Sequence, residues 1–248
     1  MSSSVRKCLV AICHNGPVVY QKTAQSLMEL GWGNRVEEAK TAHGFEAIDF
    51  AWFTTFPRVD ALRDSAMDAA RQWGYTHVLF LDADMIWPTD VLSKMLAHHA
   101  DGIVSGLYVL RHPPYAPVAM ADKFREEGST VDQFFHVELA TTDLIACDVV
   151  GMGCALIPVD VLDKIGPRPW FVYQDDDHGW PRVTEDVPFC TKAKAAGVPI
   201  WLDPTISCGH LSADVKDVRH HKRYLQAKQD TLSAMPFKII RSDAEDAA

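Results

Sequence analysis

The stretch THVLFLDADMIWP (Thr76–Pro88) joins an apolar run to two acids and decides the fold. Its run VLFL predicts a buried strand that stops at Asp82 and Asp84, and Pro88 is placed to open the next helix. In an extended backbone, side chains two residues apart point to the same side, so both acids are expected to face one ligand at the strand's carboxyl end. Because two carboxylates repel each other, a hard, oxygen-preferring cation is the natural occupant of this site.

Composition limits the classes of protein to which the chain can belong. At 248 residues, with 48% hydrophobic and 23% charged residues, it can form one α/β domain or at most two small domains. The formal net charge of -9 argues against a basic nucleic-acid-binding groove, so no nucleic-acid partner is expected. The six cysteines are scattered without CxxC pairs, which favours reduced thiols in the core over a zinc site.

The hydrophobic segments also bear on location. No segment approaches the roughly 20 uninterrupted apolar residues of a membrane span, so none is expected. The first apolar run, CLVAIC, is too short for a convincing signal peptide. The default expectation is a cytoplasmic protein.

Apolar runs and Gly or Pro breaks in the first part of the chain predict alternating strands and helices. The expected strands cover 7–13, 45–54, 76–81 and 102–105, and the expected helices cover 17–31, 59–73 and the segment after Pro88. This alternation predicts a mostly parallel, doubly wound sheet that binds ligands at the carboxyl ends of its strands. Residues 1–105 would form the nucleotide-binding half.

The second part of the chain is less regular. An extended path over 106–120 and a polar surface excursion over 121–130 precede expected strands at 132–140, 146–158 and 198–202. Helices are expected at 158–165 and 184–196, a loop at 203–210, and a polar helical tail from 214 that ends in a frayed acidic segment. The glycines of VVGMGCALIP are read as points of close backbone approach, because the third glycine of a dinucleotide fingerprint is missing.

An ordered set of motifs resembles the GT-A-fold glycosyltransferases of the family-2-like group, in their short, soluble, single-domain form. The motifs are DAD, GLYVLRHPP, GMGCALI, TEDVPFCTKAKAAGVPIWLDP and the histidine of CGH, spread over residues 5–212. The resemblance implies a GT-A, Rossmann-like, three-layer α/β sandwich with a mostly parallel central sheet. It also implies a catalytic domain over 1–212, with an acceptor and catalytic half at 106–212 and a helical tail at 213–248.

The resemblance implies a divalent cation at the DAD motif. Asp84 would ligate the metal, Asp82 would contact the ribose or the water shell of the metal, and His210 would supply a late ligand. A cation that bridges the phosphates of a nucleoside diphosphate assists its departure as a Lewis acid. Carboxylate, imidazole and phosphate ligands suit Mn²⁺ or Mg²⁺, and the nitrogen ligand favours Mn²⁺.

The resemblance also implies a catalytic base. Asp186 matches the second acid of the ED motif and would take a proton from the acceptor hydroxyl, a role that typically contributes ~10²–10⁴-fold. Glu185 would orient the acceptor or the loop. The alternative interpretation is structural, because acids in the first turn of a helix interact favourably with its dipole.

Two arginines are candidate donor contacts. Arg63 matches an arginine that often precedes the DxD strand and would pair with the diphosphate. Equally, it could be a solvated helix residue paired with Asp60 or Asp64. Arg111, after the strand expected at 102–105, is a candidate contact for the donor phosphate or the acceptor.

Further candidates lie at strand ends and in loops. His14 and Asn15 follow the first strand and are placed to touch the nucleotide base. Trp180 would stack on an acceptor sugar. The acidic cluster at 175–177 fits a solvated loop better than a second metal site.

The implied function is transfer of a sugar from a nucleoside-diphosphate sugar, with uridine favoured and guanosine possible, to a carbohydrate, protein or other hydroxyl acceptor. Processive polymer synthesis is not expected, because no Q/RxxRW-like motif is present. A nucleotidyltransferase acting on sugar phosphates is disfavoured, because HNGPVVYQK lacks a Gly-rich, basic loop. A non-catalytic nucleotide-sugar-binding protein is disfavoured by the joint presence of Asp84, Asp186 and His210. Inversion and retention at the sugar both stay open.

Overall fold

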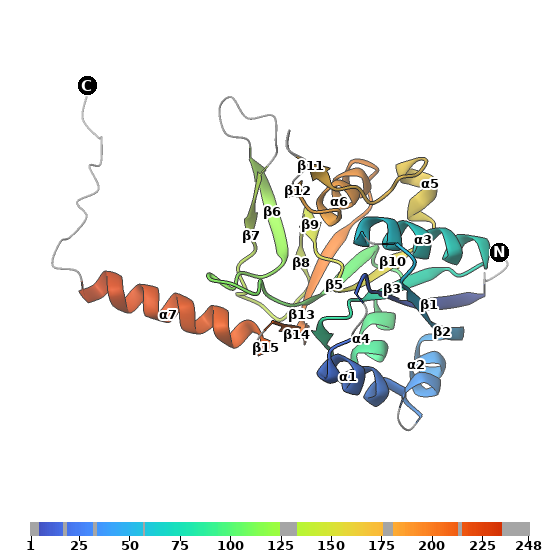
Figure 1. Ribbon diagram of the computed structural model, residues 1–248, viewed down its shortest axis with the longest axis horizontal. Coiled ribbons are helices and arrows are strands. Elements are labelled where there is room, and N and C mark those ends of the chain that lie inside the picture. The colour runs from blue at the N-terminus through green and yellow to red at the C-terminus, as the bar shows by residue number, and fades with distance from the viewer. Residues whose placement is uncertain are drawn as a thin grey trace.

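The computed structural model describes residues 5–16, 19–31, 34–56, 58–124, 133–175, 181–212 and 215–234. A seven-stranded sheet runs through its centre (Figure 1). In spatial order its strands are β2 (Phe45–Phe53), β1 (Arg6–Cys13), β3 (His77–Leu81), β10 (Cys154–Pro158), β5 (Ile103–Leu107), β13 (Ile200–Ser207) and β8 (Ile145–Ala146). Only β10 and β8 run against the other strands, so the sheet is mostly parallel.

Helices cover both faces of this sheet (Figure 1). One face carries α3 (Val59–Gln72), α5 (Val161–Ile165) and α6 (Asp186–Ala195), and the other carries α1 (Gln21–Gly31), α2 (Arg35–His43) and α4 (Val91–Ala97). Along β1, Leu9 and Ala11 pack into the first layer, while Val10 and Ile12 pack into the second. Burial on both faces explains why this strand reads as a continuous apolar run. The predicted three-layer α/β sandwich is therefore confirmed.

Smaller sheets and one long helix complete the fold. One sheet has the order β15 (Val215–Lys216), β14 (Gly209–Leu211) and β4 (Met85–Ile86). Another has the order β7 (Gln133–His136), β6 (Ala119–Phe124) and β9 (Val149–Val150), and β11 (Gln174–Asp175) pairs with β12 (Pro181–Val183). The predicted tail helix is α7 (Val218–Ala234), which projects away from the sheet in Figure 1. The acidic end of the tail, predicted to fray, lies outside the described residues.

The loop predicted at 203–210 is wrong, because β13 continues to Ser207 and β14 follows almost at once. The pairing of β13 with β5 shifts register between Asp203 and Ser207, so Pro204 falls within an irregular stretch of the ladder. A proline is tolerated at such a position because no regular ladder hydrogen bond is required of it. This continuation carries the chain back to the end of β3.

Other departures from the prediction are local. The polar helix α2 was not predicted; it ends at Gly44, whose φ of 65° is the left-handed conformation that glycine favours. The single strand predicted over 146–158 is divided among β8, β9 and β10. The start of the predicted polar excursion, Ala121 to Phe124, belongs to β6.

Candidate active site

A pocket of about 710 Å³ opens at the carboxyl ends of β1, β3 and β5. The predicted site residues that line it are His14, Asn15, Arg63, Asp82, Asp84, Arg111, Glu185, Asp186 and His210. Trp180 and two acids of the cluster at 175–177 lie outside the described residues, so their roles stay predictions. Segments far apart in the sequence thus meet in one cavity at the edge where α/β sheets bind ligands.

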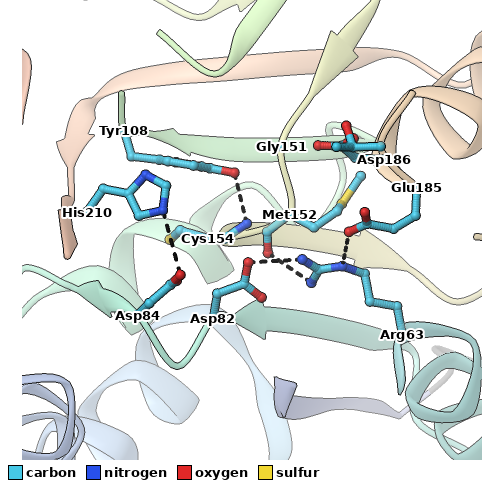
Figure 2. A network of polar contacts seen from close by, with 12 residues as sticks. Arg63, Asp82, Asp84, Tyr108, Gly151, Met152, Cys154, Glu185, Asp186 and His210 are labelled. Carbon is cyan, nitrogen blue, oxygen red and sulfur yellow. Dashed lines mark hydrogen bonds and ion pairs between the residues drawn. The ribbon is translucent and has the colours of Figure 1, made fainter. Parts of the chain in front are cut away.

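The two acids of the DAD motif line the same pocket, as predicted, but their side chains bind different neighbours. The backbone turns after β3: the Asp82 N–H donates to the Gly153 carbonyl (3.0 Å), and the Met85 N–H donates back to the Asp82 carbonyl (3.1 Å). The alternation of an extended strand therefore does not apply to these residues. In Figure 2, Asp82 points toward Arg63 while Asp84 points toward His210.

Arg63 joins two acids on one side of the pocket, and we call Arg63, Asp82 and Glu185 the inner wall. Its Nη2 donates to Asp82 Oδ2 and its Nε donates to Glu185 Oε1, each at 2.9 Å (Figure 2). The side chain of Arg63 is only 4% exposed, so it is not the solvated helix residue of the alternative interpretation. Burial raises the pKa of Asp82 despite the neighbouring charge of Arg63.

Neither acid near Arg63 on its own helix pairs with it. Asp60 instead binds Arg58, with 3.1 Å between Arg58 Nη2 and Asp60 Oδ2. Asp64 Oδ1 accepts hydrogen bonds from the backbone N–H groups of Trp170 and Phe171 at 3.0 and 2.9 Å. The local pairing considered in the sequence analysis is thus replaced by a long-range one.

Asp84, Arg111 and His210 form the opposite side of the pocket, which we call the outer wall. The pairing of β4 with β14 places His210 opposite Met85, and the Leu211 N–H donates to the Asp84 carbonyl at 2.8 Å. This short sheet brings the late histidine to the DAD turn. The imidazole Nε2 lies 3.8 Å from Asp84 Oδ2.

Hydrogen bonds determine which nitrogen of the His210 imidazole donates and which one accepts. His210 Nδ1 donates to the Val109 carbonyl at 2.8 Å, which leaves the lone pair of Nε2 facing the pocket. Arg111 Nε donates to this Nε2 at 2.8 Å, and Arg111 Nη2 pairs with Asp84 Oδ2. Burial acts to raise the pKa of Asp84, but its polar neighbours on the outer wall, among them the charged guanidinium of Arg111, outweigh burial, so this pKa is lowered.

Tyr108 supports both walls and was not identified from the sequence. Its hydroxyl oxygen accepts a hydrogen bond from the Gly153 N–H at 3.1 Å, and its ring lies edge-on to His210 with centroids 5.5 Å apart. A Cβ at Gly151 would overlap the Tyr108 hydroxyl and lie 2.7 Å from Val118 Cγ1. The first glycine of GMG thus admits the tyrosine, and an aromatic residue directly after a buried strand was the available signal.

Asp186 begins α6 at the rim of the inner wall. Its Oδ1 accepts hydrogen bonds from the Thr184 hydroxyl at 2.5 Å and from the Val187 N–H at 3.0 Å. Burial, followed by the charge of Glu185, raises the pKa of Asp186 to about 6. A carboxyl group that titrates near neutral pH is suited to exchange protons with a substrate.

His14 and Asn15 line the pocket just beyond β1, as their position after the first strand predicted. The His14 N–H donates to the Phe53 carbonyl at 3.0 Å and so continues the pairing of β1 with β2. Its Nε2 is buried and has no hydrogen-bond partner among the described residues. The same is true of Asp82 Oδ1. Both atoms are therefore available to a polar ligand.

The described residues contain no group of three or more His, Cys, Asp and Glu side chains able to hold a metal ion. Asp82 is bound to Arg63, so the predicted set of Asp82, Asp84 and His210 does not form a ready-made three-ligand site. The pair of Asp84 and His210 nonetheless fits one divalent cation, because a carboxylate oxygen and an imidazole lone pair face each other. Any further ligands would have to come from a bound molecule or water.

Comparisons with known proteins agree with the fold and leave the activity open. No protein-family model matches the chain, and no curated protein sequence matches it. A solved structure described as A197 from STIV has a TM-score of 0.53 at 18% identity, over 84% of this chain and 86% of that chain. At this identity the likeness shows a shared fold only.

Two sugar transferases resemble the chain more distantly. GalNAc-T7 with UDP, GalNAc and Mn²⁺ has a TM-score of 0.48 at 10% identity, over 91% of this chain and 48% of that chain. A mutant Drosophila galactosyltransferase 7 with manganese, UDP-Gal and xylobiose has a TM-score of 0.45 at 13% identity, over 82% of this chain and 66% of that chain. Likenesses at this level carry no conclusion about activity. Separately, every helix in the described ranges is too short or too polar to cross a bilayer.

Proposed function

We propose that the protein is a metal-dependent glycosyltransferase that moves a sugar from a nucleoside-diphosphate sugar to a hydroxyl acceptor. The observation that carries the proposal is the meeting of Asp84, His210 and Asp186, from three distant segments, around one pocket. One wall offers ligands for a divalent cation and the opposite rim offers a carboxyl group with a pKa of about 6. A bound cation would assist departure of the diphosphate, and a carboxylate base would activate the acceptor hydroxyl.

The outer wall would bind the cation and the diphosphate. Asp84 and His210 would hold Mn²⁺ or Mg²⁺, and the nitrogen ligand favours Mn²⁺. When bound, the cation would act as a Lewis acid on the departing diphosphate. Asp82 Oδ1, which is buried without a partner among the described residues, would accept a hydrogen bond from a donor ribose hydroxyl. UDP-sugars are the favoured donors and GDP-sugars are possible.

Asp186 would act as the base. As the acceptor oxygen forms a bond to the anomeric carbon, the bond from that carbon to the diphosphate breaks and the hydroxyl proton passes to Asp186. Glu185 is bound by Arg63, so its carboxylate is less available as a base than that of Asp186. Burial raises the pKa of Asp186 and the negative charge of Glu185 adds to this effect, so we assign Glu185 a positioning role.

Calorimetric titration of UDP and GDP, each with and without Mn²⁺, tests the proposal. We expect one nucleotide to bind in a Mn²⁺-dependent manner, and Asp84→Ala to reduce its affinity to the metal-free level. The matched control is Asp90→Ala, which removes an exposed acid paired with Lys94 outside the pocket and should leave binding unchanged. Retained Mn²⁺-dependent binding in Asp84→Ala would overturn the metal assignment.

A second assay separates the proposal from nucleotidyl transfer. With UTP and sugar 1-phosphates as substrates, we expect no release of pyrophosphate, whereas UDP-sugars should release UDP when a suitable acceptor is present. Release of pyrophosphate would instead establish the nucleotidyltransferase alternative.

A further inference from the structure

Arg111 binds the two atoms that a divalent cation would need. Its Nε–H is directed at His210 Nε2, and its Nη2 is directed at Asp84 Oδ2. A planar guanidinium fork matches two acceptors that lie this close together. The positive charge of Arg111 thus binds both the carboxylate and the imidazole.

Arginine and metal cannot occupy this place together. His210 Nδ1 is committed to the Val109 carbonyl, so the imidazole has one lone pair for other partners, on Nε2. That lone pair can accept the Arg111 N–H or coordinate a cation, but not both. The Arg111 guanidinium and a divalent cation would also repel each other if both lay between Asp84 and His210.

The charges around the pocket show why such an exchange is useful. Its lining carboxylates are Asp82, Asp84, Glu185 and Asp186. Of the described residues that line it, the arginines are Arg63 and Arg111, and none is lysine. Arg63 is buried and tied to two acids, whereas the side chain of Arg111 is 45% exposed. Arg111 is therefore the lining cation that can leave its partners and follow an anion.

We propose that Arg111 is an internal substitute for the divalent cation, which the cation displaces when a nucleoside diphosphate binds. The released guanidinium then contacts the diphosphate beside the metal. This inference rests on the proposed function for the identity of the anion. It makes metal and nucleotide binding cooperative, because each removes a competitor or supplies a partner for the other.

The test measures Mn²⁺ binding to the full chain by the electron paramagnetic resonance signal of free Mn²⁺, first without nucleotide. Arg111→Ala should bind Mn²⁺ roughly 5- to 10-fold more tightly than the unaltered protein, because a competing, partly exposed ion pair is removed. Arg111→Lys should fall between the two, since an ammonium group keeps the charge but lacks the fork. Unchanged or weaker Mn²⁺ binding in Arg111→Ala would overturn the proposal.

The second measurement is UDP binding at saturating Mn²⁺. Arg111→Ala should here bind UDP roughly tenfold more weakly, since the diphosphate loses a charged partner. A gain in metal affinity together with a loss in nucleotide affinity is specific to the exchange, because general damage to the site would weaken both. Equal losses in Mn²⁺ affinity and UDP affinity would show that Arg111 only supports the structure of the outer wall.

Controls separate this inference from the proposed function. Arg71→Ala removes an exposed arginine paired with Asp163 outside the pocket and should change neither affinity. Asp84→Ala should abolish Mn²⁺ binding. If Asp84→Ala keeps full Mn²⁺ affinity, the metal site itself is misplaced; if it loses Mn²⁺ while Arg111→Ala gains nothing, the metal site stands and the exchange is wrong.

Discussion

The two walls of the pocket use the same chemistry in different surroundings. In each, one arginine binds an acid of the DAD motif and a second group: Arg63 links Asp82 to Glu185, and Arg111 links Asp84 to His210. The Arg63 side chain is 4% exposed, whereas that of Arg111 is 45% exposed. Similar bonds therefore have different consequences for stability and for exchange with a ligand.

Burial accounts for the difference. Removing one partner of a buried ion pair leaves a charge that water cannot solvate, so the inner wall is costly to open. On the outer wall Asp84 is 26% exposed, but Arg111 is 45% exposed, so water can solvate the arginine when it leaves and the outer wall can exchange this partner at lower cost. The inner wall thereby fixes the shape of the pocket, while the outer wall is where a cation and an anion can enter.

The largest expected effect follows from breaking the inner wall. Arg63→Met leaves Asp82 and Glu185 without their shared cation, and we expect the free energy of unfolding at neutral pH to fall by about 3–5 kcal/mol. Urea unfolding followed by fluorescence measures this. Arg63→Lys should lower the free energy of unfolding by less, because an ammonium group keeps the charge but cannot bind both acids as the planar guanidinium does.

Arg111→Met is the matched control on the outer wall. Loss of an exposed pair should lower the free energy of unfolding by less than about 1 kcal/mol. Equal losses for the two methionine variants would remove the distinction between the walls. If Arg63→Met does not fold, the comparison of Arg63→Lys with Arg111→Lys still decides the question.

The next largest effect concerns Asp84 of the outer wall and Asp186 at the rim of the inner wall, whose pKa values shift in opposite directions. The pKa of Asp84 is lowered, whereas that of Asp186 is raised to about 6. If Asp186 is the base, Asp186→Asn should cut turnover at least ~100-fold and leave donor binding within about twofold. In the unaltered protein, turnover should fall about tenfold per pH unit below about pH 6 and level off above it, because the base works deprotonated.

Thr184→Val sharpens this test. The Thr184 hydroxyl donates to Asp186 and so acts to lower the pKa of that carboxyl group. Its removal should move the acid limb of the pH profile to higher pH. A profile that is flat from pH 5 to 7, or a limb that persists in Asp186→Asn, would exclude Asp186 as the base.

The parts of the fold that sequence predicts well are those with a strong local signal. The continuous apolar runs of β1 and β3 required burial on both faces, and the repeating apolar positions of α3 required one covered face. By contrast, α2 buries mainly Ala39 and has no apolar stripe, so its packing against the other helices of its layer determines it. Residues 203–207 extend β13 and pair with β5 at Asp203 and Ser207, a long-range pairing that no local pattern in the sequence indicates.

The residues that form the site could be predicted from the sequence, but which of them bind each other could not. Strand-end acids, the acid pair before α6 and the late histidine stand out by residue type and order. That Arg63 binds Asp82 and Glu185 depends on how α3 and α6 sit over the sheet, which no local pattern encodes. The different directions of Asp82 and Asp84 accompany the hydrogen bond from the Asp82 N–H to Gly153, which lies in the turn before β10, far along the chain.

The smallest expected effect tests how the walls are joined. Tyr108 binds Gly153 through its hydroxyl on the side of Asp82 and packs its ring against His210. Tyr108→Phe keeps the ring but leaves the buried Gly153 N–H without its acceptor, so we expect a loss of about 1–2 kcal/mol in the free energy of unfolding. Mn²⁺ affinity should stay within about twofold, because the imidazole keeps its neighbouring ring. Tyr20→Phe, at an exposed tyrosine of the same pocket, should change stability by less than about 0.5 kcal/mol. If Tyr108→Phe instead weakens Mn²⁺ binding tenfold at unchanged stability, the hydroxyl acts on the outer wall directly and the two walls are not independent.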